Sequence, residues 1–381
     1  MSALPRFVGL FALMYAAFGV SSPFLPAFFA SRGLAPEQIG LLFATGTAVR
    51  LASGPLCSRL ADRTQALRVV LAACAALAAA IALSLLPGTG FPALLTISWL
   101  HAAALAPITI LADALALRAA GAGRTFEYGW VRGTGSAVFI VGTLVSGQAV
   151  GAWGLPSIIV LHAALLLGAA GAALRVPEHQ PSVVHVAQPA PPARAMDLLR
   201  IPPFRRLMLV SALVLGSHAM HDAFAVIRWS AAGVTPAMAS ALWSESVAAE
   251  VVIFFVIGPR LVERLGPAGV LALAAGAGTL RWVVMASTAE VVALALVQPL
   301  HGLTFAALHL ACMRLIAAIA PSQLAATAQA MYALGATATT ALLTLASGRL
   351  YGSFGARGFL VMALLCAAAA PLTWRLRSVA R

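Results

Sequence analysis

Long apolar runs, separated by short polar segments that carry most of the arginines, fill this chain of 381 residues. Each run is close to the roughly 20 residues that an α-helix needs to cross about 30 Å of hydrocarbon. The first run leads directly into another and is longer than the apolar core of a signal peptide, which favours a spanning helix. The runs cover residues 7–30, 37–60, 69–86, 92–117, 133–152, 156–174, 205–227, 237–258, 268–287, 291–318, 324–348 and 357–374. This pattern predicts an all-α membrane protein with 12 transmembrane helices.

A polar, proline-rich segment, residues 176–203, divides these runs into two groups of six. Its stretch 188–192 reads Gln-Pro-Ala-Pro-Pro, and a helix interior does not tolerate prolines at that density. The segment therefore predicts a cytoplasmic linker. The predicted domains are an N-terminal six-helix bundle, the linker, and a C-terminal six-helix bundle with a short cytoplasmic tail, at residues 1–175, 176–203 and 204–381.

Two short motifs recur in both halves at nearly the same spacing. Residues 33–37 (Gly-Leu-Ala-Pro-Glu) match residues 233–237 (Gly-Val-Thr-Pro-Ala) at an offset of 200 residues. Residues 60–63 (Leu-Ala-Asp-Arg) match residues 261–264 (Leu-Val-Glu-Arg) at an offset of 201 residues. Two parallel halves related by an axis along the membrane normal are the architecture of major facilitator transporters. The repeat therefore predicts two pseudo-symmetric six-helix bundles.

The same offset relates polar residues that lie inside the predicted helices. The pairs are Arg50 with Glu250, His101 with His301, and Asp113 with Arg314. In a facilitator fold the first, fourth, seventh and tenth helices line the central cavity, and Arg50 and Glu250 would lie on the helices that form the seam. We assign gating roles to Arg50 and Arg314.

Composition excludes a soluble protein, because 61% of the residues are hydrophobic and 9% are charged, where a soluble domain carries roughly 25% charge. Mean hydropathy is +0.96. The formal net charge of +13 would suggest nucleic acid in a soluble protein. Here every basic residue counted in that charge is arginine, and most of them lie in short loops, which is the positive-inside pattern of a membrane protein. We therefore reject a nucleic-acid partner.

The arginine distribution also predicts the orientation in the cell inner (cytoplasmic) membrane. Both termini are predicted to be cytoplasmic, because one set of loops then holds most of the arginines. That inner set is Arg59, Arg63, Arg68, Arg118, Arg124, Arg175, Arg194, Arg200, Arg205, Arg206, Arg260 and Arg264, with Arg375, Arg377 and Arg381 in the tail. The outer loops keep Arg32, Arg228, Arg349 and Arg357.

Acids, arginines and histidines are concentrated in the apolar segments between residues 243 and 314. They are Glu245, Glu250, Arg281, His301, His309 and Arg314. A charge at the centre of a membrane helix costs about 2.5–3.5 kcal/mol on insertion scales, so such residues pair, face a water-filled cavity, or do chemistry. Because the segments are consecutive, we expect these side chains to meet in one bundle. This stretch is interpreted as the coupling half of a transporter.

Helix geometry separates some of these candidates. Glu245 and Glu250 are about 140° apart around a helix, so both cannot face one point. His301 and His309 lie within about 80° of each other on a regular helix. For Glu250 two interpretations remain open, a proton-coupling carboxylate or a structural ion pair with Arg50 or Arg281.

His218, His221 and Asp222 share one helix face at positions i, i+3 and i+4. That spacing suits metal ligands, but no fourth ligand is visible, and a polar lining of the cavity is the favoured interpretation. The cysteines show no CxxC or CxxH spacing and lie in or beside apolar runs. We predict no metal site, no disulfide and no cofactor.

Residues 60–63 resemble the core of the facilitator signature between helices two and three, G-x-L-A-D-R-x-G-R-[KR]. The chain departs from it at Ser58, where glycine is expected, and at Gln65. The resemblance implies a state-stabilising, gating role for Asp62 and Arg63.

Further stretches are similar to the phenylpropionate permease family, a relative of the lactose permease class of proton symporters. They are residues 33–42, 111–115, 127–136, 249–254, 281–282 and 301–314. The resemblance extends over nearly the whole chain. It implies that Asp113 and Arg132 contact substrate. It also implies that Glu250, Arg281 and His301 couple substrate to protons.

The lactose-type pattern has a further acid on helix ten. This chain departs from the pattern there, because it has His309 and Arg314 instead. His221, Asp222 and Glu245 are departures as well and suggest a more polar substrate. The predicted substrate-binding residues are Asp113, Arg132, Arg281, His301, His218 and Tyr15. The predicted proton-coupling residues are Glu250, Glu245, His301, His309 and Asp222. For the arginines an internal salt bridge, and for the histidines and Tyr15 simple packing, remain alternatives.

These observations together favour a proton-coupled symporter, not an enzyme. It is expected to import an organic anion, an aromatic monocarboxylate, as a monomer in the lipid bilayer with the proton gradient as driving force. One alternative is another solute, such as a nucleoside, a sugar or a siderophore. Another is a membrane assembly or sensor protein on the same scaffold, because fold alone does not imply function.

Overall fold

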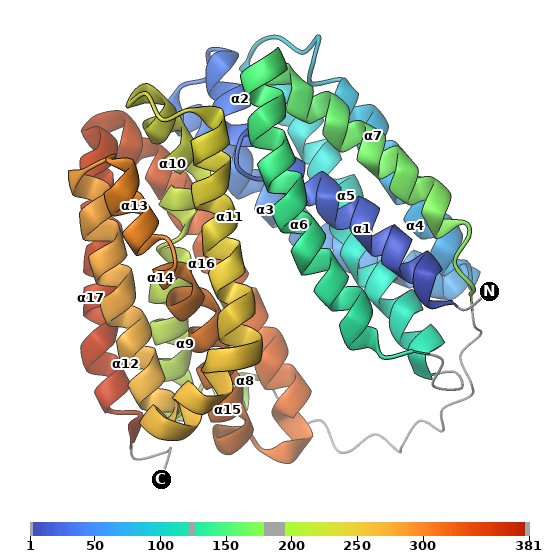
Figure 1. Cartoon of the computed structure of the whole chain (residues 1–381). Helices are drawn as coiled ribbons and strands as arrows, with labels where there is room; N and C mark the ends of the chain where they lie inside the picture. Colours follow the sequence, from blue (N-terminus) through green and yellow to red (C-terminus); the bar gives the residue numbers. More distant parts are fainter. Residues whose placement is uncertain (1–2, 122–125, 179–194, 378–381) are drawn as a thin grey trace. The chain divides into compact units, whose positions relative to one another are not determined.

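A computed structural model of the chain describes residues 3–121, 126–178 and 195–377. Every regular element in these ranges is a helix, as Figure 1 shows, so the predicted all-α class is confirmed. Part of the predicted linker, residues 179–194, lies outside the described residues, as do Arg124, Arg194 and Arg381 of the orientation argument. The described end of that segment contains a short helix, α8 (Ala195–Leu198), which the sequence pattern did not predict.

Within the described ranges, nine helical stretches are long and apolar enough to cross a membrane. Two of them contain a break, because Gly266 and Gly355 adopt positive φ angles of 69° and 54°. A shorter apolar helix, α4 (Leu67–Leu83), adds a further candidate. With the breaks counted, the stretches agree with the predicted 12 spanning helices.

Contacts divide the chain into two compact units. The first comprises residues 1–184 and 233–241. Its helices are α1 (Leu4–Ser21), α2 (Leu25–Ser31), α3 (Pro36–Thr64), α4, α5 (Phe91–Gly121), α6 (Tyr128–Trp153) and α7 (Pro156–Ala173). Helix α1 packs against α6 and α7, and α5 packs against α3 and α4 (Figure 1). Buried apolar side chains such as Phe7, Phe11 and Leu166 fill its core.

The second unit comprises residues 185–232 and 242–381. Its helices after α8 are α9 (Pro202–Gly216), α10 (Ala219–Ala231), α11 (Pro236–Val252), α12 (Gly258–Ser287), α13 (Val291–Val297), α14 (Leu300–Gly302), α15 (Leu308–Ile319), α16 (Ala325–Phe354) and α17 (Phe359–Trp374). Helix α12 packs against α17 and α15, and α9 packs against α16 and α17. The first residues of α11 group with the first unit.

Three predicted runs are interrupted rather than continuous. The run 7–30 divides into α1 and α2 around Pro23, which lacks a backbone donor. The run 205–227 divides between α9 and α10, at Ser217 and His218. The run 291–318 divides at Gln298 and Pro299.

Two π-helical turns interrupt the second unit, η1 (Ile253–Ile257) after α11 and η2 (Leu303–Ala307) after α14. Such turns insert an extra residue into a helix and occur often at functional sites. The two turns contact each other. They therefore mark the place where α11 and α14 approach.

Candidate functional site

A chain of hydrogen-bonded polar side chains crosses the interior of the second unit, with Arg281 of α12 at its centre. Arg281 has 0% of its surface exposed. Its Nε and Nη2 donate to Gln298 Oε1 at 3.2 and 2.7 Å. Its Nη1 donates to His301 Nδ1 at 2.9 Å, and its Nη2 lies 3.3 Å from His221 Nε2. One guanidinium thus connects helices α10, α12 and α14.

The donors of Arg281 determine the protonation pattern of both histidines. A guanidinium only donates, so His301 Nδ1 and His221 Nε2 accept, and each neutral ring carries its proton on the other nitrogen. His301 Nε2 is 2.6 Å from Glu250 Oε1 of α11, and His221 Nδ1 is 3.2 Å from Asp222 Oδ1. Each histidine therefore donates to a carboxylate. We name this chain, Glu250–His301–Arg281–His221–Asp222, the Arg281 network.

The Arg281 network contains two carboxylates and one guanidinium. With both histidines neutral it holds one excess negative charge, which a single proton would neutralise. The side chain of Asp222 is 56% exposed, whereas that of Glu250 is 20% exposed. An uncompensated charge is costly in a poorly solvated interior. The buried end of the network, at Glu250, is therefore most stable when its charges sum to zero. The arrangement can take up and release a proton.

Neighbouring polar and aromatic groups hold the two histidines in place. Thr304 Oγ1 donates to the His301 carbonyl at 3.2 Å, so it accepts from His218 Nε2 at 2.9 Å. The His218 and His301 rings lie 4.8 Å apart. Trp243 stacks on His221 with ring centroids 4.9 Å apart. The rings of His218 and His221, candidates for metal ligation, thus have other partners.

Gln298 and His301, on either side of the break at Pro299, both contact Arg281. Gln298 caps the C-terminal end of α13, and His301 lies in the single turn of α14, three residues further on. Because residues three apart share a helix face, both side chains reach Arg281. Gln298 is fully buried, and its Nε2 also lies 3.3 Å from His221 Nε2. The sequence interpretation missed Gln298, although a glutamine three residues before His301 in an apolar run was the available signal.

The contact between Glu250 and His301 depends on the small residue that follows the histidine. A Cβ atom on Gly302 would lie 2.7 Å from the Ala249 carbonyl oxygen and 2.9 Å from Ile253 Cγ1. Those distances are too short for a real side chain. Glycine therefore allows α11 and α14 to approach closely enough for the hydrogen bond between His301 and Glu250.

We expect Gly302→Ala to lower the thermal midpoint of the purified protein, because overpacking a tight contact costs about 1–3 kcal/mol. The matched control is Gly276→Ala on α12, where an added Cβ meets nothing within 4 Å. Alanine is a better helix former than glycine, so this control should unfold at the same or a higher temperature. Equal midpoints for both variants would contradict the close approach.

Two predicted proton-coupling residues lie outside the Arg281 network. Glu245 has no ion-pair or hydrogen-bond partner among the described residues. His309 Nδ1 lies 3.3 Å from the Tyr332 hydroxyl, and its ring contacts Phe254 at 6.1 Å. The π-helical turn η2 lies between His301 and His309, so the two rings do not share one set of partners.

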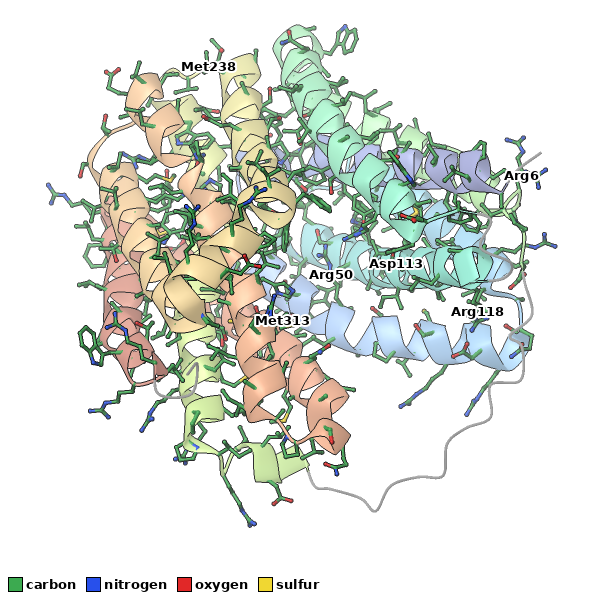
Figure 2. The ribbon with its side chains drawn as sticks, turned by 60° about the horizontal axis from the view of Figure 1, so that its bottom comes forward. Arg6, Arg50, Asp113, Arg118, Met238 and Met313 are labelled. Atoms are coloured by element: carbon green, nitrogen blue, oxygen red, sulfur yellow. The ribbon has the colours of Figure 1, made fainter. Side chains whose placement is uncertain are left out.

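The predicted gating residues occupy separate places. Asp62, at the end of α3, pairs with Arg118 of α5 at 3.5 Å, not with Arg63. Figure 2 shows Arg118 at one end of the first unit, with Asp113 and the exposed Arg50 away from that end. Arg63 and Arg314 are exposed, and neither has an ion-pair partner in the described part of the chain. The partner of Glu250 in the network is His301, which stands between Glu250 and Arg281.

The predicted substrate residues of the first unit form two adjoining contacts. The Tyr128 hydroxyl donates to Asp113 Oδ1 at 2.7 Å. The guanidinium of Arg132 lies over the Tyr15 ring, 5.0 Å from its centroid. Tyr15 packs closely on α6, because a Cβ on Gly135 would lie 2.9 Å from its ring. Asp113 and Arg132 thus have separate partners instead of forming a direct ion pair.

The comparisons with known proteins agree with this architecture. The MFS_1 like family model matches residues 5–362 of the chain. The chain belongs to the MFS_1 like family. A probable 3-phenylpropionic acid transporter of Escherichia coli (strain K12) is 32% identical over 368 residues, which are 94% of this chain and 93% of that protein. The resemblance predicted from the sequence motifs is therefore confirmed.

Solved structures show the same fold for this family member. The nucleoside transporter NupG superposes with a TM-score of 0.82 at 18% identity, covering 100% of this chain and 99% of that chain. A bacterial homolog of the human lysosomal transporter Spinster, inward-facing and unoccupied, has a TM-score of 0.79 at 15% identity, covering 99% and 97%. The protein is a multi-pass membrane transporter of the major facilitator type.

Proposed function

We propose that the protein is a proton-coupled symporter that imports an organic anion, a phenylpropionate-like aromatic carboxylate, by alternating access. The observation that carries this proposal is the Arg281 network, a buried guanidinium joined through two histidines to two carboxylates. The printed name of the Escherichia coli relative supports the substrate class. No cofactor is needed, since the proton gradient across the cytoplasmic membrane supplies the driving force.

Arg281 is suited to hold a substrate carboxylate. A guanidinium binds a carboxylate through two parallel charge-assisted hydrogen bonds, which are roughly twice as strong as bonds to neutral acceptors. Its acceptors in the structure are Gln298 and the two imidazole rings of the network, all of them neutral. A substrate carboxylate would therefore replace one of these acceptors. Arg281 is fully buried, so neighbouring side chains must move for the anion to reach it.

The charge count of the network links the anion to a proton. A substrate anion at Arg281 adds a second uncompensated negative charge to a weakly solvated site, which is costly unless a proton enters with it. Glu250 and His301, in contact at 2.6 Å, are the groups that would hold this proton. Coupling of this kind is reciprocal, so a bound proton strengthens anion binding by the same factor.

Uptake of 3-phenylpropionate into proteoliposomes tests the proposal. A monoanion that moves with one proton carries no net charge, so a one-unit inward pH gradient supplies about 1.4 kcal/mol, or tenfold accumulation. We expect accumulation with a pH gradient at zero membrane potential. We expect none with a potential alone, set by potassium and valinomycin. Protein-free liposomes under the same gradient measure passive entry of the neutral acid.

Accumulation driven by the potential alone would contradict one-to-one symport. If no aromatic acid accumulates above the protein-free control, the substrate class is wrong. The same vesicles then measure uridine, lactose and a ferric siderophore, which represent the alternative solutes. A protein that moves none of them would be an assembly or sensor protein.

A further inference from the structure

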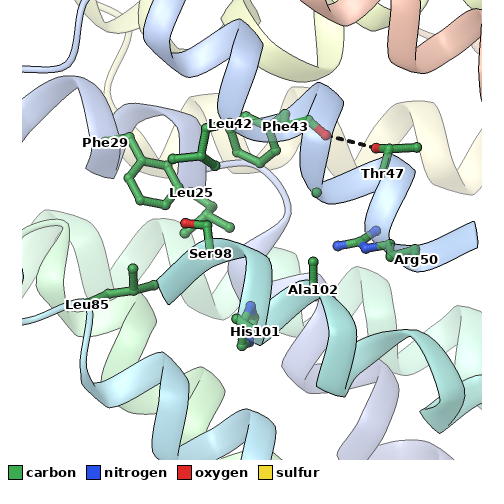
Figure 3. Close-up of a pocket in the computed structure, with 11 residues that line it drawn as sticks. Leu25, Phe29, Leu42, Phe43, Thr47, Arg50, Leu85, Ser98, His101 and Ala102 are labelled. Carbon is green, nitrogen blue, oxygen red and sulfur yellow. Dashed lines mark hydrogen bonds between the residues drawn. The ribbon is translucent and has the colours of Figure 1, made fainter. Parts of the chain in front are cut away.

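The first unit contains a pocket between α2, α3 and α5, shown in Figure 3. Apolar side chains such as Phe29 and Leu42 line one part of it. Arg50, Ser98 and His101 also line it, and Figure 3 shows Arg50 reaching from α3 towards the helix that carries the other two. A cation, a hydroxyl and an imidazole therefore converge beside an apolar wall, as in small-ligand sites.

The hydroxyl of Ser98 in this pocket has hydrogen-bonding capacity to spare. Ser98 is 9% exposed, and its buried Oγ has no hydrogen-bond partner. Buried hydroxyls are nearly always bonded, so an unpartnered one that lines a pocket points to a missing ligand. Thr47, in contrast, donates to the Phe43 carbonyl of its own helix at 2.9 Å. Ser98 is thus the hydroxyl that remains for a ligand.

The tautomer of His101 is determined by its neighbour. His162 Nδ1 lies 2.8 Å from the Ala17 carbonyl oxygen, which only accepts, so this nitrogen carries the proton. The Nε2 of a neutral His162 then accepts from His101 Nε2, which is 3.1 Å away. The neutral His101 ring therefore has a lone pair on Nδ1. Nδ1 has no hydrogen-bond partner among the described residues.

The internal repeat gives an independent argument. Arg50 and His101 occupy the positions that correspond to Glu250 and His301 in the second half. In the second unit this pair is a carboxylate bonded to a histidine at 2.6 Å. In the first unit the corresponding pair is a cation and a histidine that line one pocket, without a carboxylate of the chain among its lining residues.

We propose that this pocket is a second ligand site, which binds a small monocarboxylate together with one proton. One carboxylate oxygen would bind the Arg50 guanidinium and accept from Ser98. The other oxygen would face His101 Nδ1, and two lone pairs repel unless a proton lies between them. That proton enters either as the acid O–H or on Nδ1.

No carboxylate of the described residues faces His101 to balance the charge of Arg50 and the added proton. The charged or titratable side chains that face it are Arg50 of α3 and His162 of α7. Helices α4 and α6 also pack against α5. The described parts of these two helices present no such group to His101; Arg68 of α4 pairs with Glu178. The balancing negative charge therefore comes from the ligand.

Equilibrium dialysis of radiolabelled benzoate against the full-length protein in detergent tests the site. We expect Arg50→Gln to remove one bound equivalent of benzoate. We expect Ser98→Ala to raise the dissociation constant at this site about fivefold, as the loss of one hydrogen bond does. Arg59→Gln, an exposed arginine on the same helix, is the matched control and should bind as wild type. Binding at this site should take up one proton per benzoate in weakly buffered solution.

Full benzoate stoichiometry in Arg50→Gln would overturn the proposal, as would binding without proton uptake. If Arg50→Gln does not fold, Ser98→Leu fills the pocket and should remove the same equivalent. Arg281→Lys, which keeps the positive charge of the Arg281 network, should leave this equivalent in place, so the test does not depend on transport. Loss of benzoate binding in phosphatidylglycerol nanodiscs, but not in phosphatidylcholine nanodiscs, would assign the pocket to an anionic lipid headgroup and overturn the carboxylate.

Discussion

Replacing Glu250 with glutamine is expected to abolish accumulation of 3-phenylpropionate under an inward pH gradient while exchange of substrate across the membrane continues. Glutamine keeps the size of glutamate, and its oxygen can still accept from His301 Nε2, which lies 2.6 Å from Glu250 in the wild type. It removes the charge and the site for a proton. The measurement is gradient-driven uptake in proteoliposomes, compared with counterflow at equal pH on both sides.

Glu245→Gln is the matched control, because it makes the same change on the same helix at a carboxylate outside the Arg281 network. We expect this variant to accumulate substrate as the wild type does, about tenfold for each unit of pH gradient. The opposite result, with Glu245→Gln inactive and Glu250→Gln active, would assign the proton to Glu245. Two active variants would exclude both carboxylates from the proton path.

The fold follows from the sequence because the bilayer imposes its thickness on every spanning helix. Apolar runs of about 20 residues have no other stable arrangement in hydrocarbon than helices with satisfied backbone bonds. The interruptions were harder to predict. Pro23 and Pro299 show where a helix loses a donor, but the π-helical turns η1 and η2 depend on how two helices pack around Gly302. Packing of that kind is not visible in a hydropathy pattern.

The same limit applies to the site. The sequence indicated that Glu250, Arg281 and His301 belong to consecutive helices, and the structure brings the three together. Their order along the hydrogen-bonded chain depends on helix rotation and on the turn at Gln298, so it could not be read from spacing. The predicted angle between His301 and His309 assumed a regular helix, and the π-helical turn η2 between them interrupts that regularity.

Replacing Arg281 with lysine is expected to abolish saturable uptake, although the positive charge is kept. An ammonium group is a compact point charge, whereas the planar guanidinium reaches Gln298, His301 and His221 at once. Lysine therefore loses both the bidentate grip on a carboxylate and part of the network. Arg264→Lys, at an exposed arginine of α12 before the break at Gly266, is the matched control and should transport normally. Normal uptake by Arg281→Lys would exclude the guanidinium as the substrate anchor.

Arg281→Gln separates the structural role of the arginine from its role in binding. Removing the cation of the network leaves both of its carboxylates uncompensated, and leaving a buried charge without compensation costs about 3–5 kcal/mol. We expect a large fall in the thermal midpoint. The double variant Arg281→Gln/Glu250→Gln has one excess negative charge in the network, as the wild type does. Its thermal midpoint should therefore lie between those of Arg281→Gln and the wild type, while uptake stays absent. If uptake returned together with stability, Arg281 would be a structural residue and the substrate carboxylate would bind elsewhere.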